Sequence, residues 1–396
     1  MSDVVIVGIG QTPVGEHWDL SLRNLAARAM LAAIKDAGGL KPQAVYIGNF
    51  LASTLLGQAN LGALLTDNAG LSGAEGITLE AAGASGAAAF RMAHLAVASG
   101  AVDVALALGV EKCTDTAPAE LETAAAQALD YDYEEMQGLT LTSQAALLMQ
   151  RYLYENDLPR TALAGFAVLA HANAAANPHA MFRRAVSREQ VEHAGMLSDP
   201  LNQFDMAPYA DGAAALLLTR AELAPASLQH PLVRVLGSSC VIDAVSLHDS
   251  PDPLAFEAAR LSVERACRKA GILPGDVDLF ELHDAFSIYA ALSLEAAGFA
   301  PRGQGWKLAE DGSLSLNGKL PVSTLGGLKA RGNPLGASGT YQLVEAVQQL
   351  RGQAGASQVK NARRALVQSL GGAATTAVTH VLERWQPADR VYDHPN

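Results

Sequence analysis

The sequence predicts a duplicated α/β fold with a mostly helical segment inserted into its first half. The tetrapeptide Gly-Ala-Ser-Gly occurs twice, at residues 83–86 and 336–339, and each copy opens a stretch with helical spacing. Upstream of each copy lies a second shared landmark. It is an Ala-Gly pair followed closely by Leu and Pro, within residues 35–42 and again within residues 268–274. Because solenoid repeats span only about 20–50 residues, two landmarks repeated in the same order at this distance indicate two duplicated halves.

Alternating patterns define the elements of the first half. Apolar runs predict strands at residues 4–9, 44–50, 77–80 and 102–110. Helical spacing predicts helices at 22–37 and 86–98, between these strands. The pattern then changes to polar, Ala-rich and Glu-rich segments, which predict helices at 120–130, 142–153 and 161–173. We therefore expect an inserted, mostly helical loop domain over residues 112–206, with the first half made of 1–111 and 207–225.

The second half repeats the first, over residues 226–396. Strands are expected at 213–218, which closes the first half, and at 232–238, 277–282, 365–368 and 377–382, with helices near 255–270, after Asp284 and after the second Gly-Ala-Ser-Gly. A loop rich in glycine, leucine and serine spans residues 303–327. Loops of this length in a compact domain tend to be functional.

Composition excludes several classes of protein. The chain has 396 residues, is 49% hydrophobic and 17% charged, and carries a net charge of −12 without a Lys/Arg cluster, so it can bury a large core but offers no footing for nucleic acid or an anionic membrane. Its three isolated cysteines indicate neither a disulfide framework nor a metal site. No secretion signal and no apolar run of about 20 residues is found, so we expect a cytoplasmic protein that handles metabolites.

Several motifs resemble the thiolase superfamily along nearly the whole chain, most closely its sterol-carrier-protein and archaeal branch. They lie at residues 7–13, 109–112, 211–215, 246–249, in the His-Asp-Ala-Phe box at 283–286 and in the double glycine at 371–372. The resemblance implies the thiolase fold, with βαβαβαββ halves in five layers (αβαβα), and a homodimer or homotetramer. It also implies an acyl-CoA thioester of lipid metabolism as ligand, with coenzyme A as part of the substrate and no covalently bound cofactor.

Two departures from the family pattern indicate a degenerate active site. In catalytic thiolases a nucleophilic cysteine opens the first central helix, where this chain has Gly83, and the histidine of a Gly-His-Pro motif is here Asn333. Loss of a nucleophile commonly costs about 10⁴–10⁶ in turnover, and loss of its base as well costs little more. A cysteine acyl-enzyme is therefore not expected.

The resemblance still implies an oxyanion hole. His283 would help to hold a thioester oxygen, Asn333 can donate to the same oxygen but cannot take a proton, and the backbone N–H groups of Gly83 and Gly372 would form the second oxyanion site. These groups together could stabilise an enolate beside a CoA thioester.

Further candidates complete the predicted site. His283 and Tyr341 are candidate bases, and Ser85, within the first Gly-Ala-Ser-Gly, is a candidate substitute nucleophile and a candidate contact of the CoA ligand. Arginines of the loop domain, among them Arg183 and Arg184, are candidate partners for the CoA phosphates.

Three functions stay open at this point. The first is carbon–carbon bond chemistry on acyl-CoA without a covalent step, of retro-aldol type, as in thiolase-like relatives that lack the cysteine and work with a small partner carrying an OB fold and a zinc ribbon. One difference counts against it, because those relatives often replace the box histidine by tyrosine whereas His283 is present here. The second is a catalytically silent homologue that binds acyl-CoA or acts as a scaffold. The third is an acetyl-CoA acyltransferase with a substitute nucleophile.

Overall fold

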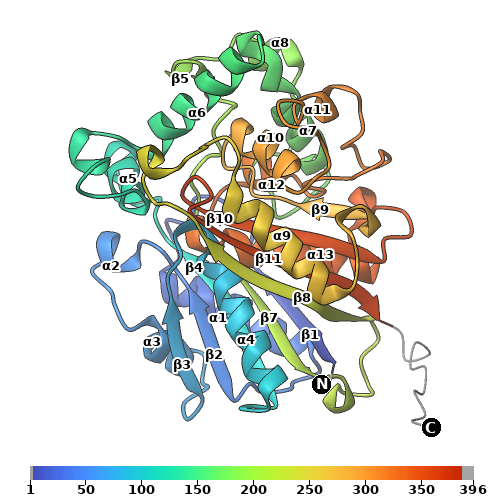
Figure 1. Cartoon of the computed structure of the whole chain (residues 1–396). Coiled ribbons are helices and arrows are strands. Elements are labelled where there is room, and N and C mark those ends of the chain that lie inside the picture. The colour runs from blue at the N-terminus through green and yellow to red at the C-terminus, as the bar shows by residue number, and fades with distance from the viewer. Residues whose placement is uncertain (1–2, 386–396) are drawn as a thin grey trace.

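The strand order reveals the duplication directly (Figure 1). The computed structural model describes residues 3–385, so residues 1–2 and the last part of the expected second half, 386–396, lie outside it. A nine-stranded sheet has the order β3-β2-β4-β7-β1-β8-β11-β10-β9. Its first half consists of β1 (Val4–Gln11), β2 (Ala44–Gly48), β3 (Glu75–Leu79), β4 (Val104–Glu111) and β7 (Gly212–Arg220). Its second half consists of β8 (Leu232–Ile242), β9 (Leu279–Glu281), β10 (Arg364–Gly371) and β11 (Thr376–Trp385).

The halves meet where β1 pairs with β8. Outward from this pair the first half continues with β7, β4 and β2, and the second half continues with the equivalent β11, β10 and β9. In each half the first and last strands pair antiparallel. In the first half β3 extends the sheet parallel to β2, whereas in the second half a single parallel bridge between Phe280 and Val322 takes that place.

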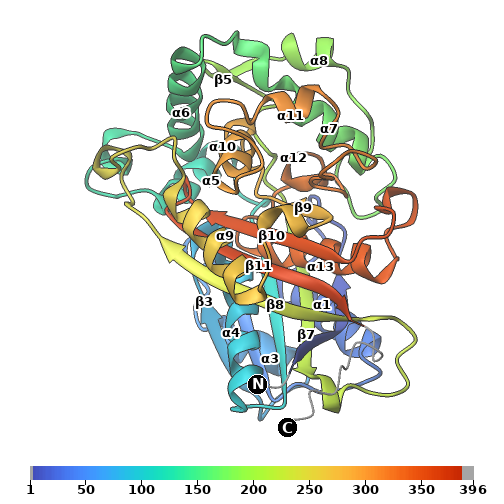
Figure 2. The same cartoon turned by 45° about the vertical axis from the view of Figure 1, so that its right-hand side comes forward.

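The two halves of the sheet form two layers of strands, and helices between and outside them complete five layers (Figures 1 and 2). Helix α1 (Leu22–Asp36) packs on the outer face of the first half, beside α3 (Leu61–Asn68). Helices α4 (Ser85–Ser99) and α13 (Ser338–Arg351) contact each other and strands of both halves, so they form the central layer. Helix α9 (Glu257–Ala270) covers β8 and β11 from outside and contacts α10 (Ser287–Ala296). The expected αβαβα arrangement is therefore present, and strands such as β4 are buried along their whole length because helices cover both faces.

The segment between β4 and β7 is mostly helical and lies at one end of the molecule (Figures 1 and 2). It contains α5 (Pro118–Ala125), α6 (Leu141–Glu155), α7 (Ala164–Ala174) and α8 (Arg188–Glu192). A small hairpin of β5 (Met196–Ser198) and β6 (Leu201–Asn202) was not predicted. The short helices α11 (Lys307–Glu310) and α12 (Gly327–Arg331) lie at the same end, with α11 inside the segment expected to be a loop. Helix α2 (Ala52–Leu55) follows β2.

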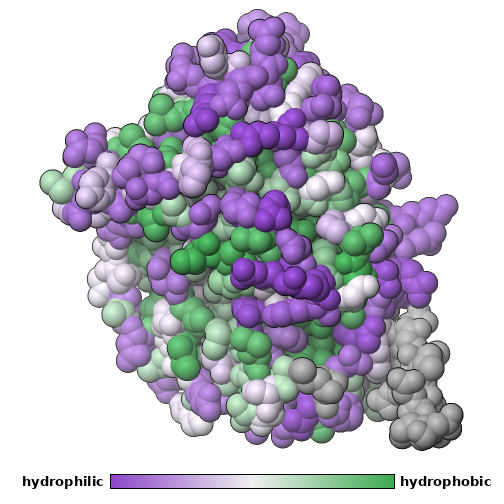
Figure 3. Space-filling view, viewed as in Figure 1, coloured by the Kyte–Doolittle hydropathy of each residue, from purple (hydrophilic) through white to green (hydrophobic). Residues whose placement is uncertain are grey.

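The surface of this end is mostly hydrophilic, whereas hydrophobic patches appear lower on the same face (Figure 3). Within residues 3–385, no helix combines the length and the apolar character that a membrane span requires.

Candidate active site

The two Gly-Ala-Ser-Gly copies lie against each other at the centre of the molecule. Each copy spans a 3₁₀ turn and the start of a helix, Ala82–Ala84 before α4 and Leu335–Ala337 before α13. A Cβ atom on Gly86 would lie 2.9 Å from the carbonyl oxygen of Gly336, and one on Gly339 would lie 2.6 Å from the backbone nitrogen of Ala87. Glycine is therefore needed for close packing, and that packing brings the two helix starts to one site.

The buried carboxylate of Glu111 joins the two halves beside these helix starts. It accepts the backbone N–H groups of Phe50 (3.0 Å) and Leu51 (3.1 Å) from the first half and that of Gly336 (3.0 Å) from the second. The side-chain amide of Asn49 donates to it as well, at 2.8 Å. Burial raises the pKa of Glu111 to about 7, against the effect of these donors. The Gly-Val-Glu-Lys motif at residues 109–112 thus fixes the geometry of the site.

Asp211, in another of the motifs, anchors the chain where it returns from the inserted segment. Its carboxylate accepts the Nζ atom of Lys112 at 2.9 Å and the backbone N–H groups of Cys113 (2.7 Å) and Thr114 (2.9 Å). These bonds hold the start of β7 to the end of β4. Asp211 lies two residues after Tyr209, so they also position that segment.

Four residues predicted from the sequence line one small cavity of about 30 Å³: Gly83, His283, Asn333 and Gly372. They come from four segments of the chain, namely the two helix starts, the loop after β9 and the turn after β10. The remaining walls are mostly apolar, and two tyrosines, Tyr209 and Tyr289, also border the cavity.

His283 lies beside Gly83 and is neutral. A Cβ atom on Gly83 would lie 3.1 Å from Cε1 and 3.2 Å from Nε2 of His283. The Nδ1 atom is buried without a hydrogen-bond partner. Burial, and to a smaller extent the positive charge of Arg331, lower the pKa of His283 to about 3. At neutral pH this imidazole can donate one ring N–H but is a weak base.

The side chain of Asn333 is held in one orientation. Its Oδ1 atom accepts the backbone N–H of Leu335 at 3.2 Å and the hydroxyl of Ser338 at 2.8 Å. The carbonyl end is thereby occupied at the start of α13, so the Nδ2 amide is the end left to donate to a ligand.

The sequence reasoning missed both tyrosines of the cavity. The hydroxyl of Tyr209 donates to Glu122 at 3.0 Å, and burial raises the pKa of Tyr209 well above its ordinary value. The hydroxyl of Tyr289 is buried without a partner, and burial raises its pKa as well. Tyr289 lies six residues after His283, so the His-Asp-Ala-Phe box could have pointed to it. The sequence around Tyr209 carries no comparable signal.

Two predicted residues do not take part in the cavity. Tyr341 is fully buried, and its hydroxyl donates to the carbonyl oxygen of Thr12 at 2.9 Å, away from the cavity. Its assignment as a base is wrong, because this turn of α13 faces the strands. The hydroxyl of Ser85 donates to the carbonyl oxygen of Ala82 at 2.7 Å and accepts the N–H of Ala81 at 2.9 Å. Its assignment as a nucleophile or ligand contact is wrong too, because the hydroxyl is buried in the first turn of its own helix.

No thiol borders the cavity, although all three cysteines lie within the described residues. Cys113 packs near the cavity wall with Ala82 and Leu335. Its thiol donates to the carbonyl oxygen of Ala210 at 3.4 Å, and burial raises its pKa well above the ordinary value. Cys113 is therefore protonated and does not supply the missing nucleophile.

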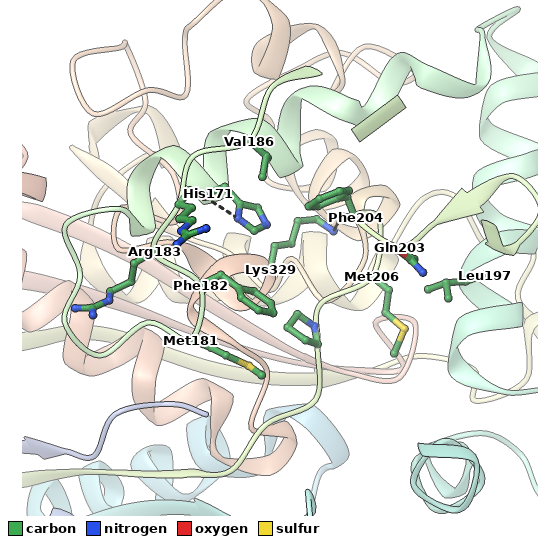
Figure 4. Close-up of a pocket in the computed structure, with 12 residues that line it drawn as sticks. His171, Met181, Phe182, Arg183, Val186, Leu197, Gln203, Phe204, Met206 and Lys329 are labelled. Atoms are coloured by element: carbon green, nitrogen blue, oxygen red, sulfur yellow. Dashed lines mark hydrogen bonds between the residues drawn. The ribbon is translucent and has the colours of Figure 1, made fainter. Parts of the chain in front are cut away.

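The two predicted arginines, Arg183 and Arg184, border a larger open pocket next to the cavity. In Figure 4, Arg183 lies at one end of this arginine pocket, Lys329 in the middle and Met206 at the other end. The Nζ atom of Lys329 donates to the carbonyl oxygens of Asp205 (2.7 Å) and Phe204 (3.2 Å), and burial lowers its pKa to about 8. Met206 lines both spaces, so the arginine pocket adjoins the cavity.

The fold and the cavity define a duplicated α/β protein with hydrogen-bond donors, but no cysteine, at the junction of its halves. Residues 4–222 match the family model "Thiolase, N-terminal domain", and residues 239–384 match "Thiolase C-terminal domain-like". The chain belongs to the thiolase family.

Relatives are similar over almost the whole chain. An acetyl-CoA acetyltransferase of Methanothermobacter thermautotrophicus is 41% identical, over 97% of this chain and 100% of that protein. The benzoylsuccinyl-CoA thiolase subunit BbsB of Thauera aromatica is 32% identical, over 93% and 94%. Sterol carrier protein 2 of Bos taurus is 31% identical, over 95% of this chain and 71% of that protein. A solved structure titled "Ltp2-ChsH2(DUF35) aldolase" superposes with a TM-score of 0.83 over 98% of this chain and 99% of that one, at 24% identity, and so bears on the fold alone.

Proposed function

We propose that this thiolase-family chain binds an acyl-CoA thioester and cleaves or forms a carbon–carbon bond in it by retro-aldol chemistry, without a covalent intermediate. One observation carries the proposal: Gly83, His283, Asn333 and Gly372 line one cavity that has two tyrosines and, among the described residues, no thiol. The names of the relatives, which include acetyl-CoA acetyltransferases, support an acyl-CoA ligand.

The neutral donors suit the negative charge that develops in this reaction. When the bond between the α- and β-carbons breaks, its electron pair moves onto the thioester oxygen to form an enolate. A ring N–H of His283 and the Nδ2 amide of Asn333 can donate to that oxygen. A histidine with a pKa lowered to about 3 keeps its role as a donor over the whole physiological range.

The pair of Tyr209 and Glu122 supplies the base in place of Tyr341. Tyr209 lines the cavity and its hydroxyl already donates to the Glu122 carboxylate at 3.0 Å. As the β-hydroxyl of the substrate passes its proton to Tyr209, Tyr209 passes its own proton to Glu122. The β-carbon leaves as a carbonyl compound, and a proton returned to the α-carbon converts the enolate into the shorter acyl-CoA.

The arginine pocket suits the CoA moiety. Arg183 and Arg184 are exposed cations that can contact phosphates, and Lys329 adds a buried one. Since Met206 borders both spaces, a pantetheine arm passing it would bring the thioester to His283.

Turnover of short 3-hydroxyacyl-CoA thioesters to acetyl-CoA and an aldehyde tests the proposal. Tyr209→Phe and Glu122→Gln should lower kcat by about 10²–10⁴ while CoA binding is retained. Matched controls are Tyr154→Phe, an exposed tyrosine, and Glu120→Gln, on the same helix as Glu122. Acyl-CoA binding without cleavage of any 3-hydroxyacyl-CoA would favour the silent binder instead, and an acyl adduct on the protein would favour an acyltransferase.

We also propose the partners that the family resemblance implies. A small OB-fold and zinc-ribbon protein should co-purify with the tagged chain from cells that express its gene neighbours, and the turnover assay is run with and without it.

A homodimer or homotetramer is the second part of this proposal. Ile77 on the edge strand β3 is 50% exposed, and Met92 and Leu95 on the neighbouring α4 are each 39% exposed. Leu95→Glu should therefore dissociate the assembly in light scattering, whereas Leu31→Glu, on the exposed side of α1, should not.

A further inference from the structure

A third cavity adjoins the cavity of His283 and Asn333, which we call the reaction cavity, and it also shares Leu197 and Met206 with the arginine pocket. Its lining surface is mostly apolar, but its polar groups are hydroxyls and two carboxylates, and we call it the hydroxyl pocket; its polar lining includes Thr116, Thr142, Ser198, Glu16, Glu122 and Tyr209. Tyr209 and Met206 line both the hydroxyl pocket and the reaction cavity. These two side chains therefore form the boundary between the two spaces.

Two residues of the hydroxyl pocket hold this junction in place. The Glu122 carboxylate accepts the hydroxyl of Tyr209 at 3.0 Å through one oxygen and the backbone N–H of Thr142 at 3.2 Å through the other. The hydroxyl of Thr142 donates to the sulfur of Met206 at 3.4 Å. The two side chains at the boundary, Tyr209 and Met206, are thus each bonded to a residue of the hydroxyl pocket.

The charge of the hydroxyl pocket is one-sided. Glu16 and Glu122 face no lysine, arginine or histidine among the described residues that line it. A carboxylate accepts hydrogen bonds and donates none, and threonine and serine hydroxyls can accept as well. An occupant with hydrogen-bond donors finds partners here, whereas a carboxylate would meet repulsion from two like charges. A purely apolar occupant can contact the apolar part of the lining but offers no hydrogen bonds to these polar groups.

We infer that the hydroxyl pocket receives the far end of the acyl chain and selects acyl groups that end in a hydrogen-bond donor, a hydroxyl or an ammonium, over those that end in a carboxylate or a methyl group. The inference rests on the proposed function, in which the CoA moiety occupies the arginine pocket. With CoA on that side and the thioester beside His283, the acyl chain leads past Tyr209 into the hydroxyl pocket.

Four CoA thioesters with the same six-carbon chain test the inference by calorimetry: 6-hydroxyhexanoyl-CoA, 6-aminohexanoyl-CoA, hexanoyl-CoA and adipoyl-CoA. The hydroxyl and ammonium compounds should bind about fivefold more tightly than hexanoyl-CoA, since each hydrogen bond contributes roughly 1 kcal/mol. Adipoyl-CoA should bind about tenfold more weakly than 6-hydroxyhexanoyl-CoA because of the like charges. Tighter binding of the ammonium compound alone would overturn donor recognition in favour of charge attraction.

Two variants and a control test which side chains cause the discrimination between these thioesters. Glu122→Gln should reduce the discrimination against adipoyl-CoA to about threefold or less, because one of the two like charges is removed. Glu120→Gln, the same change on the same helix but outside the pocket lining, should leave it unchanged. Thr142→Val provides a second variant and should weaken 6-hydroxyhexanoyl-CoA with little effect on hexanoyl-CoA. Equal affinity for all four thioesters would overturn the inference and leave the proposed function standing, whereas binding of none would overturn both.

Discussion

A cysteine introduced at Gly83 is the sharpest test of how this cavity works. A Cβ atom there would lie 2.7 Å from the carbonyl oxygen of Leu370 and 3.1 Å from Cε1 of His283. The first contact is with backbone at the end of β10, so that strand end or the 3₁₀ turn must shift. Overpacking of this kind costs about 1–3 kcal/mol, and Gly83→Ala should show the same loss because the added Cβ is common to both variants.

The chemistry of the new thiol depends on His283. A nucleophilic cysteine usually needs a nearby cation to favour the thiolate, but burial lowers the pKa of His283 to about 3, so the neighbour is neutral. We therefore expect the Gly83→Cys thiol to stay protonated at pH 7 and to form no acyl adduct with acetyl-CoA. Addition of Asn333→His supplies a second imidazole in the cavity, and the double variant should regain an acyl adduct and measurable thiolysis of acetoacetyl-CoA.

Intact-mass spectrometry after incubation with acetyl-CoA, the pH dependence of iodoacetamide labelling and urea unfolding measure these three effects. Gly83→Ala separates the steric cost from the thiol chemistry, and the wild-type chain should show no acyl adduct. Thiolate reactivity at pH 7 in the single variant, or an acyl adduct on the wild-type protein, would refute the reasoning. A double variant that binds no CoA would show that the substrate pocket is absent.

Further predictions concern stability and reactivity. Burial lowers the pKa of three histidines in the folded chain: His94 (about 4), His283 (about 3) and His380 (about 3). Because these side chains take up protons on unfolding below pH 6.5, each should lower the free energy of unfolding by up to about 1.4 kcal/mol per pH unit as the pH falls from 6.5 towards 4. The urea midpoint measures this effect, and a flat profile would contradict it. Tyr341→Phe loses the bond to Thr12 and should cost about 1 kcal/mol in urea unfolding without changing kcat, and a large fall in kcat would restore Tyr341 as a base. Glu345 pairs with Arg331 at 2.6 Å in a buried position, and burial raises the pKa of Glu345 to about 8, so Glu345→Gln should cost about 3–5 kcal/mol in the same assay at pH 9 and less at pH 7; a neutral effect at pH 9 would contradict it. In the native chain Cys240, the exposed thiol, should be alkylated at least tenfold faster than the two buried ones, as peptide mapping would reveal.

Much of the fold could be predicted because repeated landmarks constrain it from two sides. The two Gly-Ala-Ser-Gly copies marked the central helices. The apolar runs marked strands buried on both faces, because such strands are continuously hydrophobic and do not alternate between apolar and polar residues. The hairpin at Met196–Ser198 and Leu201–Asn202 was missed because it is only three and two residues long. Runs this short leave no period to detect.

The site was predictable where a motif fixed both the residue and its place. Gly83, His283, Asn333 and Gly372 were found through such motifs, and they do meet. Tyr209 was not found because its side chain reaches the cavity through the pairing of its segment with Asn333, a long-range contact with no local pattern.

The misassigned residues failed for a related physical reason. Helical spacing placed Tyr341 on a helix near the site but could not fix which way that helix is rotated, and Tyr341 faces β1 and β7. Ser85 has the right location, yet its hydroxyl satisfies backbone groups at the start of its own helix, as serine commonly does there.

The single carboxylate of Glu111 binds backbone from both ancestral repeats, Phe50 and Leu51 on one side and Gly336 on the other. If the chain were divided into two polypeptides, the protonation of this buried group would affect their association, beside the β1–β8 pairing and the packing of α4 on α13. Burial raises the pKa of Glu111 to about 7, so the joined halves favour the protonated carboxyl, and reassembly of such fragments should weaken as the pH rises from 4.5 to about 7.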